Sequence, residues 1–277
     1  MGLEEVRRAL AEDRASDDIT TRLLGARGDC AGVGRFVAEG RFVVAGWPVV
    51  ASVFQELEPA ARLEPLISEG QWTAPGTPIA TVRASTRAHL AGERVALNFL
   101  QRLSGVATLT RRAVDAVAGT GAQITHTRKT TPGLRALECY AVTVGGGVPN
   151  RGSLAEAVYW KDNHWAMLDG SDTALARALA LAPDGAPVVV EVDTETQLEQ
   201  ALAAGVRHIL VDNQPPAVVA AWARRAGSGV TIQASGGITA DNARAYAEAG
   251  ARLISMGALT HSVMAAPISY ETAPLAQ

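Results

Sequence analysis

Short apolar segments recur at a nearly constant interval in the second half of the chain, and this regularity constrains the fold most. The segments begin at Val188, His208, Val230 and Leu253, so successive starts lie about twenty residues apart. The first three are each followed by a stretch with helical character, and the segments lack the alternation typical of strands exposed on one face. A doubly wound open sheet would give similar local patterns, but the interval favours a (β/α) barrel.

The first half has a different pattern, which changes near residue 105. Short β-like runs are expected over 34–38, 41–45 and 79–82, and they are too few to form a stable sheet without helices packed on them. A helix is expected over 89–103, and Ser104-Gly105 is expected to interrupt it before a second helical stretch.

Charge and composition exclude several classes of protein. The net charge of −3 lacks the basic excess of a nucleic-acid-binding chain, although a local cluster of cations could still bind an anionic substrate. The only cysteines, Cys30 and Cys139, are too few for a disulfide framework. No apolar run approaches the roughly 18 residues of a membrane span, and the acidic N-terminus lacks the apolar core of a secretory signal. We therefore expect a cytoplasmic protein.

Polar residues follow each expected strand of the second half. In a (β/α) barrel the carboxyl ends of the strands share one open mouth, where catalytic groups gather. The residues at these ends are Arg128 and Lys129, Lys161, Glu191, Asp212, the turn Ser235-Gly236-Gly237, and Gly257.

Cations, acids and glycine-rich turns at one mouth suggest a polyphosphate bound with a divalent metal. Glycines let backbone N–H groups approach phosphate oxygens, and the loops after the last barrel strands are the usual phosphate site. Glu191 and Asp212 offer the hard oxygen ligands that Mg²⁺ prefers. Each feature alone has an ordinary structural explanation as a turn, cap or ion pair. Together they favour an enzyme that handles a phosphorylated ligand.

Several longer motifs, in order along nearly the whole chain, resemble the quinolinate phosphoribosyltransferase family. They are Glu93-Arg94-Val95-Ala96-Leu97-Asn98, Leu103-Ser104-Gly105-Val106-Ala107-Thr108, Thr127-Arg128-Lys129-Thr130-Thr131-Pro132-Gly133, Gly145-Gly146-Gly147, Lys161-Asp162-Asn163-His164, Glu191-Val192-Asp193, Val211-Asp212-Asn213, Ala234-Ser235-Gly236-Gly237-Ile238-Thr239 and Gly257-Ala258-Leu259-Thr260-His261-Ser262.

This resemblance implies a fold and a reaction. The fold would be an N-terminal α/β sandwich over 1–105, on which the C-terminal tail can pack back, and an incomplete barrel of six or seven strands over 106–277. The reaction would move a phosphoribosyl group from 5-phosphoribosyl 1-pyrophosphate (PRPP) to the ring nitrogen of quinolinate. Loss of CO₂ and pyrophosphate gives nicotinate mononucleotide in Mg²⁺-dependent NAD biosynthesis. The family forms dimers or hexamers.

The resemblance also implies site residues. Arg94, Arg128 and Arg151 match substrate-carboxylate arginines, and Arg94 would enter the neighbouring subunit's site. Lys129 and Lys161 match lysines beside the carboxylate and pyrophosphate groups. Glu191 and Asp212 match catalytic acids at the ribose and the metal. The residues that match the 5′-phosphate cradle are Ser235, Gly236, Gly237 and Gly257.

Departures from the family pattern cluster near the acceptor. Asn150 stands where a quinolinate-binding histidine is usual, and His126, Cys139, Thr143 and Tyr159-Trp160 also differ from the usual residues. Asn150 could keep a hydrogen bond to quinolinate. Alternatively, the acceptor could be another heteroaromatic carboxylate of specialised metabolism. A third hypothesis, a non-catalytic binding or regulatory relative, fits poorly with the retained Lys129, Lys161, Glu191 and Asp212.

Overall fold

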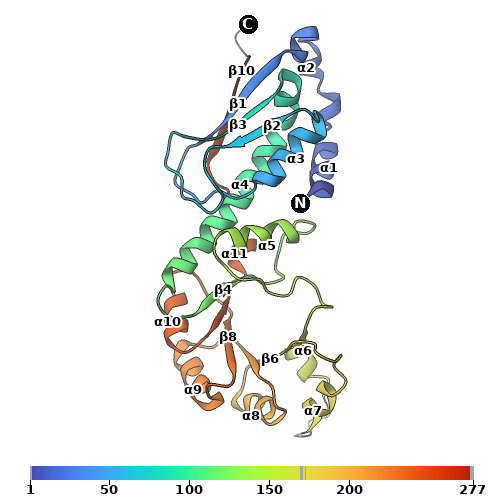
Figure 1. Cartoon of the computed structure of the whole chain (residues 1–277). Coiled ribbons are helices and arrows are strands. Elements are labelled where there is room, and N and C mark those ends of the chain that lie inside the picture. Colours follow the sequence, from blue (N-terminus) through green and yellow to red (C-terminus); the bar gives the residue numbers. More distant parts are fainter. Residues whose placement is uncertain (1, 169–170, 172, 275–277) are drawn as a thin grey trace. The chain divides into compact units, whose positions relative to one another are not determined.

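The computed structural model describes residues 2–168, 171 and 173–274, and the chain divides into two compact units, each with its own sheet (Figure 1). The first unit contains residues 1–111, 131–146 and 263–277, and the second contains 112–130 and 147–262. The chain therefore leaves the first unit and returns to it before its C-terminal strand.

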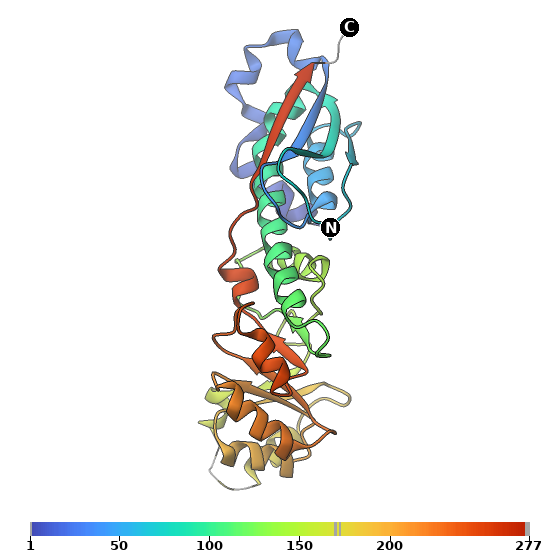
Figure 2. The ribbon, with the colours of Figure 1, turned by 90° about the vertical axis from the view of Figure 1, so that its left-hand side faces the viewer.

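The sheet of the first unit is antiparallel and has the strand order β10-β1-β3-β2. Buried and more exposed residues alternate along β1, as expected for a strand that covers a core with one face. Strand β10 pairs with β1 from Gly32↔Pro274 to Ala38↔Ile268, and Figure 2 shows the red β10 beside the blue β1. The strands are β1 (Ala31–Ala38), β2 (Arg62–Pro65), β3 (Thr77–Ser85) and β10 (Ile268–Pro274).

Helices and aromatic side chains complete the core of this unit. Helix α3 begins after Gly46 with Pro48 in its first turn, where a missing N–H costs nothing, and it buries Phe54. Phe36 of β1 lies edge-on to Phe54, with ring centroids 6.2 Å from Trp47 and 6.4 Å from Phe54. The helices are α1 (Leu3–Glu12), α2 (Ile19–Arg22), α3 (Trp47–Leu57), α5 (Arg135–Val144), and the 3₁₀ turns Ala15–Asp17 and Gly25–Asp29.

The expected interruption at Ser104-Gly105 is wrong: helix α4 runs unbroken from Thr86 to Ala116. A Cβ at Gly105 would meet the backbone oxygen of Met264 and lie 2.8 Å from Val263 Cγ1. The Ser104 hydroxyl is buried and bonds the backbone of Ala45. Gly105 thus serves close packing inside the helix, where tertiary contacts override its low helix propensity.

The strand expected over 41–45 is also wrong. Within this segment only Val43 forms a β-bridge, to Trp72, among the residues described. The backbone N–H groups of Phe42, Val43 and Ala45 bond instead to hydroxyls of Thr73, Thr108 and Ser104. Side-chain hydroxyls therefore satisfy these three donors, while the Val44 N–H and the carbonyls of Phe42 and Val44 bond to the backbone of 70–73.

The second unit holds a six-stranded parallel sheet with the order β4-β9-β8-β7-β6-β5. Strands β4 and β5 are consecutive in the chain but occupy the two ends of this order, so the ring of strands is open between them. The strands are β4 (Gln123–Thr125), β5 (Val158–Trp160), β6 (Val188–Val192), β7 (His208–Asp212), β8 (Thr231–Ser235) and β9 (Leu253–Ser255).

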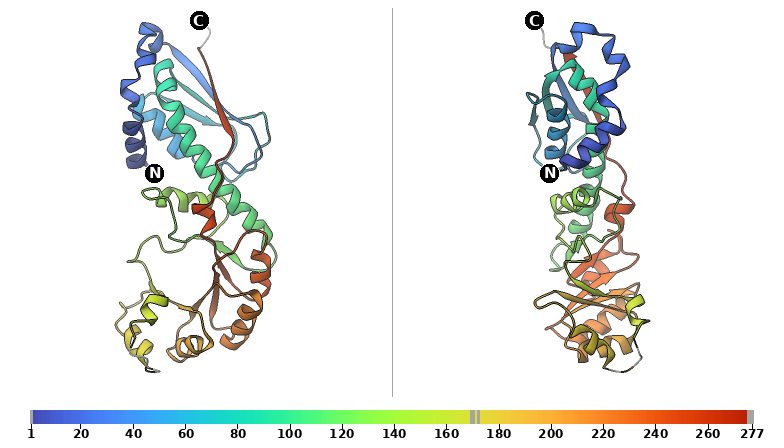
Figure 3. Two further views of the ribbon diagram at one scale, coloured as in Figure 1. Left: turned by 180° about the vertical axis from the view of Figure 1, so that it is seen from behind. Right: turned by 90° about the vertical axis from the view of Figure 1, so that its right-hand side faces the viewer.

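Helices separate these strands in sequence, and in the left view of Figure 3 the orange helices follow the outer side of the curved sheet. They are α6 (Asp162–Trp165), α7 (Ala174–Leu179), α8 (Glu195–Ala203), α9 (Pro216–Ala226), α10 (Ala243–Glu248) and α11 (Ala258–His261). The α/β class, with an N-terminal sheet unit and an incomplete barrel, is confirmed, and the barrel has six strands. Within the described residues, no helix is long and apolar enough to cross a membrane.

Candidate active site

The second unit brings the expected strand-end residues to the carboxyl edge of its sheet. Asp212 and Ser235 are paired residues at the ends of β7 and β8, and Glu191 lies beside Leu210 near the end of β6. Parallel strands place all their carboxyl ends on one edge, so the order of the sheet gathers residues that are far apart in sequence.

Lys161 and Glu191 form an ion pair across the ends of β5 and β6. The Lys161 Nζ lies 2.6 Å from Glu191 Oε2, and the two side chains are 43% and 6% exposed. The indole N–H of Trp165 donates to the Glu191 carbonyl at 2.8 Å, which fixes the backbone at this strand end. The Lys161 backbone N–H donates to His164 Nδ1, which caps α6. The carboxyl edge of the sheet thus holds a buried carboxylate beside a half-exposed ammonium.

Additional carboxylates surround this pair. Partial burial raises the pKa of Asp193, and the negative charges of Asp212 and Asp162 raise it further, while Lys161 opposes them. Asp212 accepts a hydrogen bond from Asn213 Nδ2 at 2.6 Å. The carboxylates of this cluster therefore repel one another, and a divalent cation would relieve that repulsion.

The turn after β8 is shaped by a close approach of two backbones. Gly236 has a φ of +89°, and a Cβ there would lie 2.6 Å from the Asn213 backbone nitrogen. Asn213 itself adopts a φ of +52° and donates its N–H to the Ser235 carbonyl. Asn242 then accepts from Thr239 N–H and donates to the Gly237 carbonyl. These bonds give Ser235-Gly236-Gly237 a defined path with exposed backbone at Gly237.

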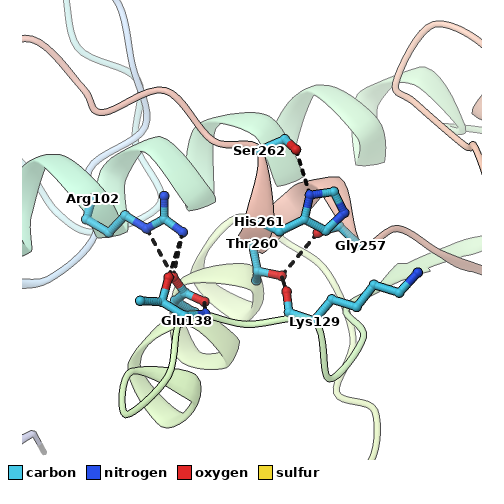
Figure 4. A network of polar contacts seen from close by, with 8 residues as sticks. Arg102, Lys129, Glu138, Gly257, Thr260, His261 and Ser262 are labelled. Carbon is cyan, nitrogen blue, oxygen red and sulfur yellow. Dashed lines mark hydrogen bonds and ion pairs between the residues drawn. The ribbon is translucent and has the colours of Figure 1, made fainter.

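The segment after β4 is held by the short helix α11. Figure 4 shows the Thr260 hydroxyl between the carbonyls of Lys129 and Gly257, at 2.7 and 3.2 Å. A Cβ on Gly257 would lie 3.2 Å from Lys129 Cδ, so the Lys129 side chain can lie against Gly257 because this residue has no side chain. Lys129 is exposed beyond this contact.

Three of the residues expected at the acceptor, Arg128, Asn150 and Arg151, lie in the second unit. The pKa of Arg151 is lowered mainly by burial and also by the positive charge of Arg128, so the two guanidinium groups are electrostatic neighbours. Asn150 Oδ1 accepts the Arg151 backbone N–H at 2.8 Å. Paired guanidinium groups are suited to bind carboxylates, because each can donate two parallel hydrogen bonds.

Arg94 belongs to the first unit, where it is exposed on α4. The same unit contains the buried Glu138, which accepts hydrogen bonds from Arg102 at 2.7 and 3.0 Å and is also drawn in Figure 4. Glu138 further accepts from Thr131 N–H and its hydroxyl. The loop that continues the Arg128-Lys129 motif therefore has a fixed anchor at Thr131.

Models of quinolinate phosphoribosyl transferase match the chain in both parts. The N-terminal domain model matches residues 18–104, and the C-terminal domain model matches residues 106–271. The chain belongs to the quinolinate phosphoribosyl transferase family.

Individual relatives agree with this membership. The nicotinate-nucleotide pyrophosphorylase (carboxylating) of Mycobacterium leprae is 42% identical, over 94% of this chain and 93% of its own. The human protein of the same name is 36% identical, over 82% of this chain and 77% of its own. The crystal structure of NadC from Streptococcus pyogenes superposes with a TM-score of 0.92 at 33% identity, covering 99% of this chain and 96% of the other.

Sequence reasoning gave no role to two acids of this edge, Asp162 and Asp193. Asp193 directly follows β6, and Asp162 begins α6 two residues after β5; each lies within two residues of an expected site residue, Lys161 or Glu191. Their position close to the strand ends is the sequence feature from which they could have been predicted as site residues. Their mutual proximity depends on the order of strands in the sheet, which sequence spacing does not contain.

Proposed function

We propose that this chain transfers the phosphoribosyl group of PRPP to the ring nitrogen of quinolinate. CO₂ and pyrophosphate are released, and nicotinate mononucleotide is formed for NAD biosynthesis. The observation that carries the proposal is the 42% identity, over 94% of this chain, to a protein named nicotinate-nucleotide pyrophosphorylase (carboxylating). The gathered strand-end residues supply chemistry that suits this reaction.

The arginines act on the acceptor and the acids on the phosphoribosyl donor. Arg128 and Arg151 bind the acceptor carboxylates, and the turn at Ser235-Gly236-Gly237 with Gly257 receives the 5′-phosphate. Bond breaking at the ribose anomeric carbon develops positive charge, which the negative charge of the Glu191 carboxylate stabilises. Lys129 and Lys161 neutralise carboxylate and pyrophosphate charge as the leaving group departs.

Mg²⁺ fits the acids at this edge as a partner of the pyrophosphate. Within the described residues, no group of three His, Cys, Asp or Glu side chains is arranged to hold a metal ion by itself. Mg²⁺ commonly binds through one or two carboxylates together with substrate phosphates and water. Glu191 and Asp212 would supply those carboxylates, and the ion would relieve the carboxylate repulsion that adds to burial in raising the pKa of Asp193.

Replacing Asp212 with asparagine should raise the Mg²⁺ concentration needed for half-maximal rate by about tenfold or more, because one anionic ligand is lost. The measurement is initial rate against Mg²⁺ at saturating PRPP. Asp184→Asn is the matched control, since Asp184 follows α7 and lies outside the strand ends. An unchanged Mg²⁺ dependence in Asp212→Asn would remove Asp212 from the metal site.

The exposed Arg94 is proposed to complete the site of a neighbouring subunit in a homodimer or homohexamer. If so, Arg94→Ala and Lys161→Ala proteins, each inactive alone, should regain activity when their subunits are mixed, because some mixed sites carry both wild-type residues. Statistical mixing of dimers predicts up to about a quarter of wild-type activity. The rate is measured after subunit exchange. If it stays at the level of the separate variants, this arrangement is contradicted.

The acceptor is tested by competition. Wild-type protein is given PRPP, Mg²⁺ and an equimolar mixture of quinolinate and other pyridine carboxylates, and the nucleotides formed are identified by mass. Nicotinate mononucleotide made from isotopically labelled quinolinate, with one CO₂ released, is expected. A nucleotide made only from another acid would point to a different heteroaromatic acceptor. If the protein binds PRPP but forms no nucleotide, it would be a non-catalytic relative.

A further inference from the structure

The carboxamide of Asn150 is bonded at both ends within the protein. Its Oδ1 accepts the Tyr159 hydroxyl at 2.7 Å and the Arg151 backbone N–H at 2.8 Å. Its Nδ2 donates to the His126 carbonyl at 3.0 Å. Both lone pairs of the oxygen are therefore used, and the orientation of the amide is fixed by its neighbours.

His126 holds the backbone of the same residue. The imidazole is buried, and its Nε2 accepts the Asn150 backbone N–H at 3.1 Å. A ring nitrogen that accepts from an amide carries no proton, so His126 is the neutral tautomer protonated on Nδ1. Asn150 is thus attached to His126 through both its backbone and its side chain.

These bonds cross the open side of the barrel. His126 directly follows β4, and Tyr159 is the central residue of β5, the two strands at opposite ends of the sheet order. Asn150 bonds to both. It therefore links the two end strands of the sheet, which do not pair with each other in the part of the chain that the structure describes.

Tyr159 in turn supports Arg151. The guanidinium carbon of Arg151 lies 4.0 Å from the centre of the Tyr159 ring, and Nη1 donates to the Ala157 carbonyl at 3.0 Å. Burial raises the pKa of Tyr159, which keeps its hydroxyl protonated as the donor to Asn150. Stacking occupies one face of the guanidinium and leaves the in-plane N–H groups that do not bond to Ala157 for hydrogen bonds to a planar carboxylate.

We infer that His126, Asn150 and Tyr159 form one positioning unit that spans the open side of the barrel and aims Arg151 at the acceptor carboxylate. Asn150 acts through Arg151 and Tyr159 and does not itself provide the main acceptor contact. The inference rests on the proposed function, because it assigns these residues to the acceptor half of that reaction.

The unit predicts a selective kinetic effect. Tyr159→Phe removes the hydroxyl donor and keeps the ring, so KM for quinolinate should rise about three- to tenfold. Tyr159→Leu also removes the stacking surface, so KM should rise by more than about tenfold. KM for PRPP and kcat should each change less than about twofold in Tyr159→Phe. The matched control is Tyr246→Phe on α10, which lies in the second compact unit but outside the positioning unit. It should leave all three parameters unchanged.

Crystal structures give a measure that does not depend on turnover. Arg151 should stay over the ring in Tyr159→Phe and leave its wild-type position in Tyr159→Leu. Equal effects of Tyr159→Phe on both KM values, or an unmoved Arg151 in Tyr159→Leu, would overturn the positioning unit. If wild-type protein fails to use quinolinate, the proposed function is wrong, and the Arg151 position in the two variants still decides the inference.

Discussion

Replacing Glu191 with glutamine is expected to lower turnover at least about a hundredfold while the protein stays folded. Glutamine keeps the shape of the side chain and removes the charge proposed to stabilise the developing cation, and losses of transition-state electrostatic stabilisation typically reach 10²–10³-fold. Lys161, the partner at 2.6 Å, is 43% exposed, so water can solvate it when Glu191 is neutralised. The melting temperature should therefore change by less than about 5 °C.

The control for this variant is Glu199→Gln. Glu199 on α8 forms an exposed ion pair with Arg225, so the substitution removes the same charge from the same unit at a distance from the strand ends. Its turnover should match that of the wild-type protein. A folded Glu191→Gln protein with normal turnover would show that Glu191 has no role at the reacting centre, and one that unfolds would contradict the expected small change in melting temperature.

Replacing Gly236 with alanine is expected to reduce kcat/KM for PRPP about a hundredfold. Alanine resists the φ of +89°, and its Cβ would lie 2.6 Å from the Asn213 backbone nitrogen, so the turn or the end of β7 must move. Displacement of bound groups by about 1 Å can cost 10²-fold in rate. Because Asp212 precedes Asn213, the same shift disturbs both the phosphate turn and a carboxylate. The measurement of kcat/KM is the initial rate as a function of PRPP concentration at saturating quinolinate.

Gly237→Ala separates steric conflict from backbone strain. Gly237 also has a positive φ, +62°, but a Cβ there meets nothing within 4 Å. The left-handed conformation alone costs about 1 kcal/mol, so kcat/KM for PRPP should fall less than tenfold. If both variants lose activity equally, the contact with Asn213 is not what requires Gly236.

The strands of the barrel could be predicted from the sequence because the patterns that indicate them are local. Buried parallel strands lack alternation and recur with the helix between them, and the expected starts at Val188, His208 and Leu253 are the starts of β6, β7 and β9. The strand ends then identified Glu191 and Asp212, since the polar residue after an apolar run is where a barrel exposes its mouth.

Other features depend on contacts that spacing does not contain. Ser104-Gly105 carries the local signal of a helix break, but its tight packing against 263–264 keeps α4 continuous. His126, Asn150 and Tyr159 were visible only as separate unusual residues. Their joint hydrogen bonding needs the edges of the open barrel to be known, because β4 and β5 are adjacent in the chain and at opposite ends of the sheet.

The most direct test is a steady-state assay of wild-type protein with quinolinate, PRPP and Mg²⁺ in which nicotinate mononucleotide, pyrophosphate and CO₂ are all quantified. The account predicts sustained turnover, with the three products in equal amounts and none formed when PRPP or quinolinate is omitted. Protein that binds PRPP at saturating quinolinate but forms no nicotinate mononucleotide would contradict it.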